Sequence, residues 1–250
     1  MLMQAGESEP WQLLYWDTNL FGIRIARILQ PLTEVELQAY LLWAQSHDIE
    51  CTYYDCPIEH VDAIHLAQHY SFQFVDMRVL LKRSMKISVP SHASDNEIRS
   101  ARDSDIEKLQ ALSVELHKDT RFFADRRFPV AQARELYAIW MRNECAATDG
   151  VVWVKVDEND SPIGYLTCKA QGELGTIGLF GVASQYQGKG IGQALLRKGL
   201  GWFNEQKCQR VQVVTQGRNT GALASYCMQQ FLIIKQSVWL HRWTQSTGSS

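Results

Sequence analysis

The chain has 250 residues, of which 46% are hydrophobic and 21% charged, and its formal net charge is −2. This is the composition of a globular protein with room for one large domain or two small ones. A nucleic-acid-binding protein would usually show a basic excess, which this sequence lacks. It also shows no apolar run long enough to span a bilayer and no segment typical of a secretory signal, so we expect a cytoplasmic protein without a membrane span.

The N-terminal part, residues 1–83, is predicted to be a small mixed α/β domain. Thr33, followed three residues later by Glu36, has the pattern of a capping box at the start of a helix. The spacing of apolar residues predicts the remaining elements. We expect strands at Phe21–Leu29, Cys51–Cys56 and Phe72–Lys82, and helices at Thr33–Ser46 and Ile58–His69.

One pair of histidines in this part has a spacing found in metal sites. His65 and His69 are four residues apart on a predicted helix, which would place both rings on one face. Neither a third ligand nor a glutamate follows in the pattern that a metal site requires. We therefore expect no metal ion.

A serine-rich stretch at residues 84–97 is predicted to be a linker, followed by a larger domain at 98–243 and a flexible tail at 244–250. Asp103 or Ser104 should cap the first helix of the larger domain, which would run to about Lys118. The polar turn at Asp157–Pro162 should join two strands of a hairpin. The expected elements, in order, are a strand at Ile98–Ala101, the helix to Lys118, a helix at Val130–Cys145, strands at Val151–Val156, Ile163–Lys169 and Gly175–Val182, a loop and helix at Gly188–Gln206, a strand at Arg210–Gln216, a helix at Thr220–Gln229 and a strand at Leu232–Trp243.

A glycine-rich loop joins the third strand of this series to the amphipathic helix that follows. Its glycines allow the backbone to approach a ligand closely, and the first amides of the helix have no partner within it. Such a loop favours a phosphate or pyrophosphate. It is not a Walker A loop, because Gly190 stands where Ser or Thr should bind Mg²⁺. It is not a dinucleotide fingerprint either, because Gln193 occupies the position of the last glycine. A strand-to-helix turn without any ligand is the remaining alternative.

The spacing that is left, Gln185-x-x-Gly188-x-Gly190, resembles the acetyl-CoA signature of the GNAT superfamily of N-acetyltransferases, and the order of elements over about residues 98–243 is similar as well. The resemblance implies an α/β (α+β) fold with a mixed, splayed central sheet flanked by helices, and acetyl-CoA as co-substrate. It also implies that backbone amides from Gln187 to Gly192, through Lys189, Gly190 and Ile191, hold the pyrophosphate. The strand that ends at Gly181–Val182 would separate from the strand at Val211–Thr215, and the pantetheine arm would bond in that gap like a short extra strand.

A second segment, Asn219-x-x-Ala222-x-x-x-Tyr226, resembles the pattern that follows the next strand in the same family. Asn219 would contact CoA, although it can equally serve only as a helix cap. Tyr226 would be the general acid that protonates the departing CoA thiolate, although it can equally be a buried core residue. A phenol near pKa ~10 stays protonated at neutral pH, and its proton transfer to a thiol near ~8.5 is uphill by only about 2 kcal/mol. The family often has glycine where Gln230 stands here, which puts the turn after this helix in doubt.

The acceptor is suggested by a narrower resemblance. Tyr15-Trp-Asp-Thr-Asn-Leu-Phe-Gly22, Thr120-Arg-Phe122 and Trp239-Leu-His-Arg242 look like parts of the dTDP-fucosamine acetyltransferases, which act on a nucleotide-linked amino sugar in polysaccharide biosynthesis. The resemblance implies that Asp17, Arg121 and Phe122 bind the acceptor, and the planar fork of Arg121 suits a nucleotide phosphate. The base that takes the proton of the amine is not determined among Asp17, Glu115, His117 and Asp119.

Two other functions stay open at this point. A GNAT enzyme could act on another small amine or on a peptide N-terminus, or the chain could be a CoA-binding regulator without turnover. The expected partners are thus a small-molecule amine and acetyl-CoA, and a homodimer is left open. Residues 1–83 are expected to contribute to the acceptor pocket.

Overall fold

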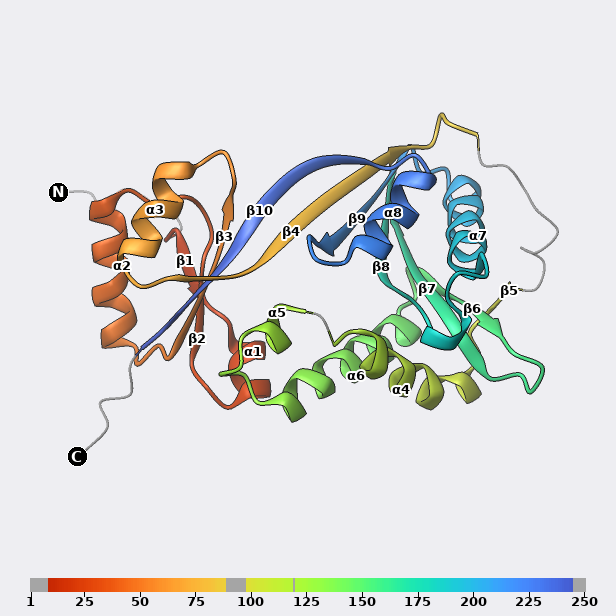
Figure 1. Cartoon of the computed structure of the whole chain (residues 1–250), viewed down its shortest axis with the longest axis horizontal. Helices are drawn as coiled ribbons and strands as arrows, with labels where there is room; N and C mark the ends of the chain where they lie inside the picture. The colour runs from red at the N-terminus through yellow and green to blue at the C-terminus, as the bar shows by residue number, and fades with distance from the viewer. Residues whose placement is uncertain (1–8, 89–97, 119, 245–250) are drawn as a thin grey trace. The chain divides into compact units, whose positions relative to one another are not determined.

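The computed structural model describes residues 9–88, 98–118 and 120–244 and divides into two compact units (Figure 1). The first unit comprises the residues up to Arg78 together with those from Gln236 onward, and the second comprises Val79–Lys235. The chain passes between the units within two long strands, β4 (Gln73–Ser84) and β10 (Leu232–Trp243). The linker predicted at 84–97 therefore begins where β4 ends, and most of it lies outside the described residues, as does the predicted tail beyond Thr244.

The first unit has a small mixed sheet. β2 (Ile25–Ile28) pairs with β1 (Trp11–Leu13) in antiparallel and with β3 (Cys51–Pro57) in parallel, and β3 pairs in antiparallel with β10. The strand predicted at Phe21–Leu29 is shorter in the structure. Its first residue belongs to α1 (Tyr15–Phe21), which ends at Gly22 in the left-handed region, with φ of 69°. Neither β1 nor α1 was predicted, because three or seven residues carry too little periodicity.

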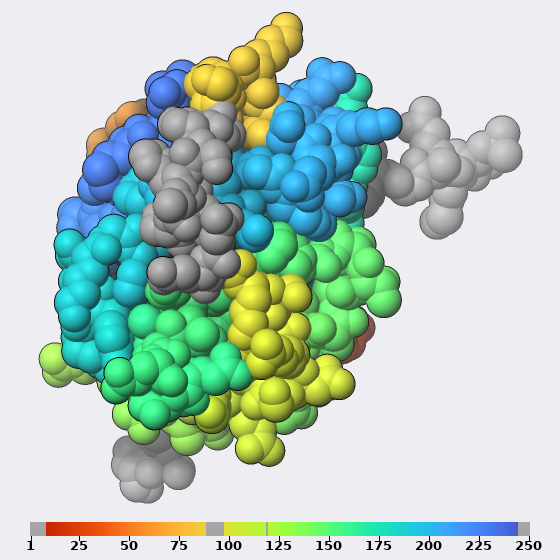
Figure 2. Space-filling view, turned by 90° about the vertical axis from the view of Figure 1, so that its right-hand side faces the viewer, coloured from red at the N-terminus to blue at the C-terminus, as the bar shows by residue number. Residues whose placement is uncertain are grey.

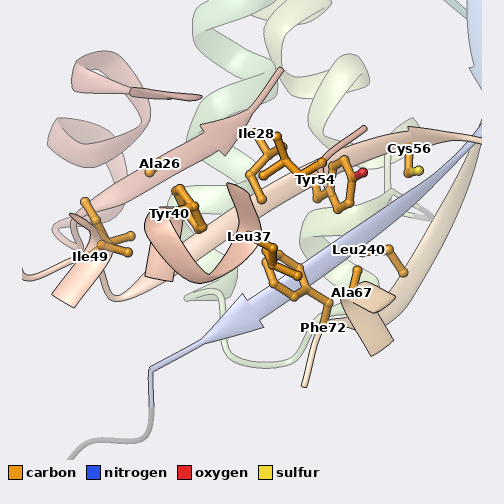
Figure 3. Packing of buried hydrophobic residues seen from close by; sticks show 12 residues of the cluster. Ala26, Ile28, Leu37, Tyr40, Ile49, Tyr54, Cys56, Ala67, Phe72 and Leu240 are labelled. Carbon is orange, nitrogen blue, oxygen red and sulfur yellow. The ribbon is translucent and has the colours of Figure 1, made fainter. Parts of the chain in front are cut away.

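One face of this sheet carries the apolar core of the first unit. Ala26 and Ile28 of β2, Tyr54 of β3 and Leu240 of β10 are buried together with Leu37 and Tyr40 of α2 (Glu34–Ser46) and Ala67 of α3 (Val61–His69). Figure 3 shows these side chains gathered between the helices and the strands. Thr33 caps α2 in the capping box that the sequence predicts. The Tyr40 hydroxyl lies 2.6 Å from that of Thr52, so this buried phenol has a polar partner.

The second unit is a larger mixed sheet with strand order β4-β9-β8-β7-β6-β5. Antiparallel pairs join β5 to β6, β6 to β7 and β7 to β8, whereas β8 and β9 are parallel. This arrangement confirms the predicted fold class. The elements are β5 (Ile98–Ser100), α4 (Ile106–Leu116), α5 (Arg121–Ala124), α6 (Val130–Ala146), β6 (Gly150–Val156), β7 (Pro162–Gln171), β8 (Leu174–Val182), α7 (Ile191–Glu205), β9 (Arg210–Gln216) and α8 (Thr220–Met228).

Two local predictions in this unit need correction. The first helix was expected to begin with a cap at Asp103 or Ser104, but these residues form a short 3₁₀ turn before α4. The Asp105 carboxylate accepts the Arg102 amide at 2.8 Å and pairs with Arg99, which stabilises the turn in place of a side-chain cap. The four-residue helix α5 was not predicted, since a single turn leaves no periodic pattern.

Helices cover both faces of this sheet, and β7 shows which helices cover which face. A Cβ at Gly199 of α7 would collide with Leu166, and one at Gly164 would lie 3.1 Å from Leu195 of α7. The alternate residues point the other way: Tyr165 meets His117 at the end of α4, and Lys169 pairs with Glu144 of α6 at 2.7 Å. Figure 1 shows α4 and α6 side by side and apart from α7, and Figure 2 shows α7 (blue) and the segment of β5 and α4 (yellow) on separate areas of one face.

The feature that positions the site is the separation of β8 from β9. Their paired positions run from Leu174 opposite Arg210 to Ile177 opposite Val213. Beyond that point β8 continues to Val182 and β9 to Gln216. A register shift between β7 and β8 falls at the same level, where the Leu179 amide donates to the Thr167 hydroxyl at 2.8 Å. The sheet therefore opens toward the carboxyl ends of β8 and β9.

No helix among the described residues is long and apolar enough to cross a membrane.

Candidate functional site

A pocket of about 520 Å³ lies at the opening between these strands, within the size range of small-molecule sites. Its wall comes from the end of β8, the β8–α7 loop, the start of α7, one side of α8 and the end of α4. Eight of the sequence-predicted cofactor residues line it: Gly181, Val182, Gln187, Gly188, Gly190, Ile191, Gly192 and Asn219. None of the described residues that line it carries a carboxylate, so the wall presents no negative charge to an anion.

The loop before α7 leaves the first amides of that helix without a cap from its own chain. Gly190 is the N-cap residue, and it has no side chain with which to accept a hydrogen bond. The first backbone bond of the helix runs from the Ala194 amide to the Gly190 carbonyl at 3.0 Å. The amides that precede Ala194 are the groups that a helix leaves unsatisfied, and the helix dipole adds a partial positive charge there. This is the local chemistry of an anion site.

The glycine positions follow from the backbone path of the loop. Gly188 and Gly190 have φ of 74° and 79°, in the left-handed region that costs other residues roughly 1–2 kcal/mol. The loop is also closed by Gln187, whose side-chain amide donates to the Val182 carbonyl at 2.9 Å. The Gln187 side chain is thus used within the loop, and its ligand-facing part is the backbone.

Lys189 lies in the same loop but is not among the residues that line the pocket. Its ammonium nitrogen is 5.2 Å from the centre of the Tyr186 ring, which is a cation–π distance. The role of Lys189 in holding pyrophosphate stays a prediction for its backbone amide.

Asn219 caps a helix and also lines the pocket, so its two predicted roles do not exclude each other. Its side-chain oxygen accepts the Ala222 amide at 3.1 Å and so caps α8. The same residue lines the pocket. Capping and a ligand contact are therefore compatible at this position.

Tyr226 is buried, with 3% of its surface exposed, and does not itself line the pocket. Its ring packs at 5.7 Å from Phe180, which does line the pocket, and at 5.6 Å from Phe231 on its other side. Burial raises the pKa of the Tyr226 phenol above its ordinary value of 10. The residue thus stays protonated at neutral pH, but it gives up its proton less readily than an exposed tyrosine would.

The turn after α8 forms in spite of Gln230. The Phe231 amide donates to the Tyr226 carbonyl at 3.1 Å and the Gln230 amide to the Cys227 carbonyl at 2.9 Å, the two bonds of a Schellman motif. Gln230 itself has φ of 62°, the conformation for which glycine is favoured. The motif brings the Phe231 ring against Tyr226 and so helps to fix the phenol.

His117 lies at the other end of the pocket, just after α4. Its Nε2 atom is 3.0 Å from the Tyr165 hydroxyl, and its ring stacks on Tyr137 with centroids 4.8 Å apart and planes 15° apart. Burial lowers the pKa of His117 to about 4. The contact between Tyr165 and His117 could not be predicted from the sequence, because they are 48 residues apart and the face of β7 on which Tyr165 lies is set by tertiary packing.

The other candidate bases differ from His117 in their surroundings. Glu115 is exposed on α4, Asp119 lies outside the described residues, and Asp17 lies in the first turn of α1 in the first unit. The predicted acceptor residues Arg121 and Phe122 lie on α5 and do not line the pocket. The Arg121 guanidinium is 4.1 Å from the centre of the Phe122 ring, and Phe122 is buried edge-on against Phe128.

Within the described residues we find no group of three or more His, Cys, Asp or Glu that could hold a metal ion.

A sheet that opens at a parallel pair, with an uncapped helix N-terminus at the opening, offers room for the pyrophosphate and the pantetheine arm of an acyl-CoA. Residues 114–229 match the model of the acetyltransferase (GNAT) family. This part of the second unit is thus similar to the GNAT acetyltransferases, and acetyl-CoA is the co-substrate of that family.

Solved structures share the fold over nearly the whole chain. A functionally unknown conserved protein from Staphylococcus epidermidis has a TM-score of 0.68 at 14% identity, over 96% of this chain and 93% of its own. A GCN5-related N-acetyltransferase from Sphaerobacter thermophilus has 0.65 at 15% identity, over 93% and 76%. A GCN5-related glucosamine N-acetyltransferase region of a fungal multi-domain β-N-acetylglucosaminidase has 0.60 at 12% identity, over 93% of this chain and 31% of that one. No curated protein matches the chain. At these identities the likeness shows the fold alone.

Proposed function

We propose that this protein transfers the acetyl group of acetyl-CoA to the amine of a small-molecule acceptor by direct attack. The observation that carries the proposal is the uncapped N-terminus of α7 at the point where β8 and β9 separate. A pyrophosphate suits the amides from Gln187 to Gly192, and a pantetheine arm suits the edge of β8 beyond Ile177, where β9 no longer pairs with it. Acetyl-CoA, when bound, supplies the activated acetyl group and a thiolate leaving group.

Tyr226 is the proposed general acid for that thiolate. Its burial keeps the phenol protonated at neutral pH, and its position behind Phe180 places it next to the pocket wall. Because burial raises the pKa of the phenol, proton donation costs more than the ~2 kcal/mol of an ordinary tyrosine. We therefore expect its contribution near the lower end of general acid catalysis, about 100-fold in kcat.

The proposed acceptor is a nucleotide-linked amino sugar. The segments around Tyr15–Gly22 and Thr120–Phe122 support it through their resemblance to dTDP-fucosamine acetyltransferases, and a structural neighbour is a glucosamine N-acetyltransferase region. In this proposal the guanidinium of Arg121 serves the acceptor phosphates, beside Phe122, and the role of Asp17 stays a prediction from the resemblance. A different small amine or a peptide N-terminus would use the same cofactor chemistry with other acceptor contacts.

The first test is calorimetric titration of the protein with acetyl-CoA, followed by an assay of free thiol release. The amine panel contains dTDP-4-amino-4,6-dideoxygalactose, glucosamine, spermidine and a tetrapeptide with a free N-terminus. One-site binding with amine-dependent thiol release supports the proposal, and the amine with the highest rate identifies the acceptor class. Binding without release from any amine favours a CoA-binding regulator, and no binding at millimolar acetyl-CoA refutes the cofactor assignment.

Tyr226→Phe tests the acid. We expect kcat to fall about 100-fold while the Kd for acetyl-CoA changes by less than about threefold, because the phenol serves the departing thiolate and not the bound thioester. Full activity in Tyr226→Phe would remove the general-acid role and leave the transferase assignment in place.

A further inference from the structure

The acetyl-transfer reaction needs a group that takes a proton from the amine, and the pocket contains one side chain suited to it. The described lining residues are otherwise apolar side chains, glycines, amides, one serine and the Tyr186 phenol. His117 alone among them carries a nitrogen lone pair that accepts a proton in water near neutral pH. The amine must lose a proton as it becomes an amide, so a base in the wall of this pocket has a defined task.

The ring of His117 is held so that one nitrogen is left for a ligand. Nε2 is engaged by the Tyr165 hydroxyl at 3.0 Å, and stacking on Tyr137 fixes the plane of the ring. Tyr165 is itself fully buried, and its hydroxyl lies directly below Gly181, where a Cβ would come within 3.3 Å of it. Nδ1 is therefore the ring nitrogen that Tyr165 does not engage, and His117 itself lines the pocket. If Nε2 carries the hydrogen and donates it to Tyr165, Nδ1 has the free lone pair.

We infer that His117 accepts the proton of the attacking amine through Nδ1, and that Tyr165 is a positioning residue that fixes the tautomer and the ring. The inference rests on the proposed function. As the amine nitrogen bonds to the thioester carbonyl carbon, its proton passes to Nδ1. The C–S bond then breaks and the sulfur takes a proton from Tyr226. The imidazolium of His117 releases its proton to solvent, and the Tyr226 phenolate takes one back from solvent, which restores both residues. Acetyl-CoA and amine thus become amide and free thiol with no other reactant.

The surroundings of His117 keep its ring neutral and thus able to accept a proton, while the same burial makes it a weaker base than histidine in water. The titratable groups that face its ring are Tyr165 from β7 and Tyr137 from α6, and neither is charged at neutral pH. On its own segment Lys118 and Glu115 are exposed. With no carboxylate in contact among the described residues, burial lowers the pKa of His117 to about 4. The imidazole is therefore neutral across the physiological range, and once protonated it passes the proton on readily.

His117→Gln is the main test, because glutamine keeps an amide near Tyr165 but cannot take up a proton. With the most active amine of the panel, we expect kcat to fall about 100-fold and the Kd for acetyl-CoA to change less than about threefold. His65→Gln, which changes an exposed histidine on α3, is the matched control and should leave both constants unchanged. A loss of kcat below about threefold in His117→Gln would overturn the inference.

Two further variants separate proton transfer from structural support. His117→Ala should regain activity with added imidazole, and with substituted imidazoles the rescued rate should rise with their basicity, whereas a purely structural residue would show no such dependence. Tyr165→Phe should lower kcat about tenfold without changing acetyl-CoA affinity, because it releases the ring but leaves the base present. An unchanged kcat in Tyr165→Phe would overturn the positioning role.

A chemical test keeps the inference independent of the acceptor. Diethyl pyrocarbonate attacks neutral imidazoles, so at pH 5 it should modify His117 ahead of ordinary histidines, which are mostly protonated there. Peptide mass mapping would locate the modified ring, and bound acetyl-CoA should protect it. If the wild type releases no thiol with any amine of the panel, the proposed function fails. The labelling then still decides whether Nδ1 of His117 is open to the pocket. If His117 is not labelled, that result alone overturns the inference.

Discussion

Three helices of this protein begin in three different ways. At the start of α2, Thr33 accepts the Glu36 amide, and the Glu36 carboxylate accepts the Thr33 amide at 2.7 Å. That bond holds the pKa of Glu36 below its ordinary value. At the start of α8, Asn219 accepts one amide. At the start of α7, Gly190 accepts none through a side chain.

The difference shows where the chain satisfies its own backbone and where it leaves the backbone for a ligand. A capping side chain is worth about 1 kcal/mol to a helix. The start of α7 gives up that contribution and also places two glycines in the left-handed region. This loss of stability is understandable if the amides serve an anion, and the pocket around them offers room for one. In the proposed function, the second unit uses the start of α7 for binding and the start of α8 for capping and binding together, whereas the first unit uses the start of α2 for stability alone.

The largest expected effect comes from putting a carboxylate at the start of α7. Gly188→Glu should lower acetyl-CoA affinity at least about 100-fold in calorimetry, because the new charge competes for the helix start that an anionic ligand needs. Gly172→Glu is the control, since Gly172 also has a left-handed φ, of 57°, and open space around it, but lies in the β7–β8 turn. Equal affinity losses in the two variants would mean that strain, not the charge at α7, is responsible.

His117, at the opposite end of the pocket, has a lowered pKa, which predicts that the stability of the protein depends on pH. His117 has a folded-state pKa of about 4, below its ordinary value of 6.5, so the unfolded chain binds this proton first as pH falls. Its contribution to stability is complete above pH 6.5 and is lost as pH falls toward 4. Between pH 7 and 5 the loss should be about 2 kcal/mol.

Urea unfolding at both pH values, in wild type and His117→Gln, measures this term. Other groups titrate in both proteins, so the difference between the two slopes isolates His117. Identical pH dependence in the two proteins would contradict the assignment of a depressed pKa.

At the start of α2 we expect an effect on stability without an effect on binding. Thr33→Ala removes the cap and should lower the free energy of unfolding by about 1 kcal/mol. Acetyl-CoA affinity should be unchanged, because Thr33 lies in the first unit and the pocket belongs to the second. Chemical unfolding and calorimetry on the same sample give both numbers, and a parallel loss of affinity would show that α2 is not a purely structural helix.

The start of α8 should respond in both measurements, and two variants separate them. Asn219→Ala should cost up to about 1 kcal/mol in stability and weaken acetyl-CoA binding by less than about tenfold. Asn219→Asp keeps a capping oxygen but adds a negative charge, so stability should stay near wild type while affinity falls further than in the alanine variant. If the aspartate variant binds as well as wild type, Asn219 only caps the helix.

The sequence was most informative where chemistry is local. The loop and helix start at Gly188–Gly192 could be predicted because glycines have direct backbone consequences, whereas phosphate binding there stays a prediction. The bounds of β9 and β10 agree with the prediction because their apolar patterns are long. The Thr33 capping box was confirmed for the same reason, since all of its partners lie within four residues.

The remaining features depend on packing between distant segments. His117 was one of four equal candidates until β7 placed Tyr165 against it and the end of α4 placed it in the pocket wall. Likewise, no local pattern says that Tyr226 is buried behind Phe180 or that Phe122 packs on Phe128. A strand has two faces, and the choice between them is made by the helices that cover it.

The smallest expected effect lies at the C-terminal ends of the helices, where residues other than glycine occupy a position that glycine usually takes. Helices α2, α3, α7 and α8 are each followed by a residue with a left-handed φ that is not glycine: Asp48, Ser71, Lys207 and Gln230. A side chain in this conformation costs roughly 1–2 kcal/mol. Replacing it by glycine removes this cost, but the greater freedom of glycine in the unfolded chain cancels about 0.5–1 kcal/mol of the stability gained.

Gln230→Gly should therefore raise the free energy of unfolding by about 0.5–1 kcal/mol, and Lys207→Gly should do the same at the end of α7. Urea unfolding of each single variant and of the double variant would show additive gains if the two turns are independent. Because the turn at Gln230 carries the bonds that hold Phe231 against Tyr226, a stabilised turn should leave kcat unchanged or slightly higher. A destabilised Gln230→Gly protein would mean that the glutamine side chain makes a contribution that outweighs the strain of its backbone.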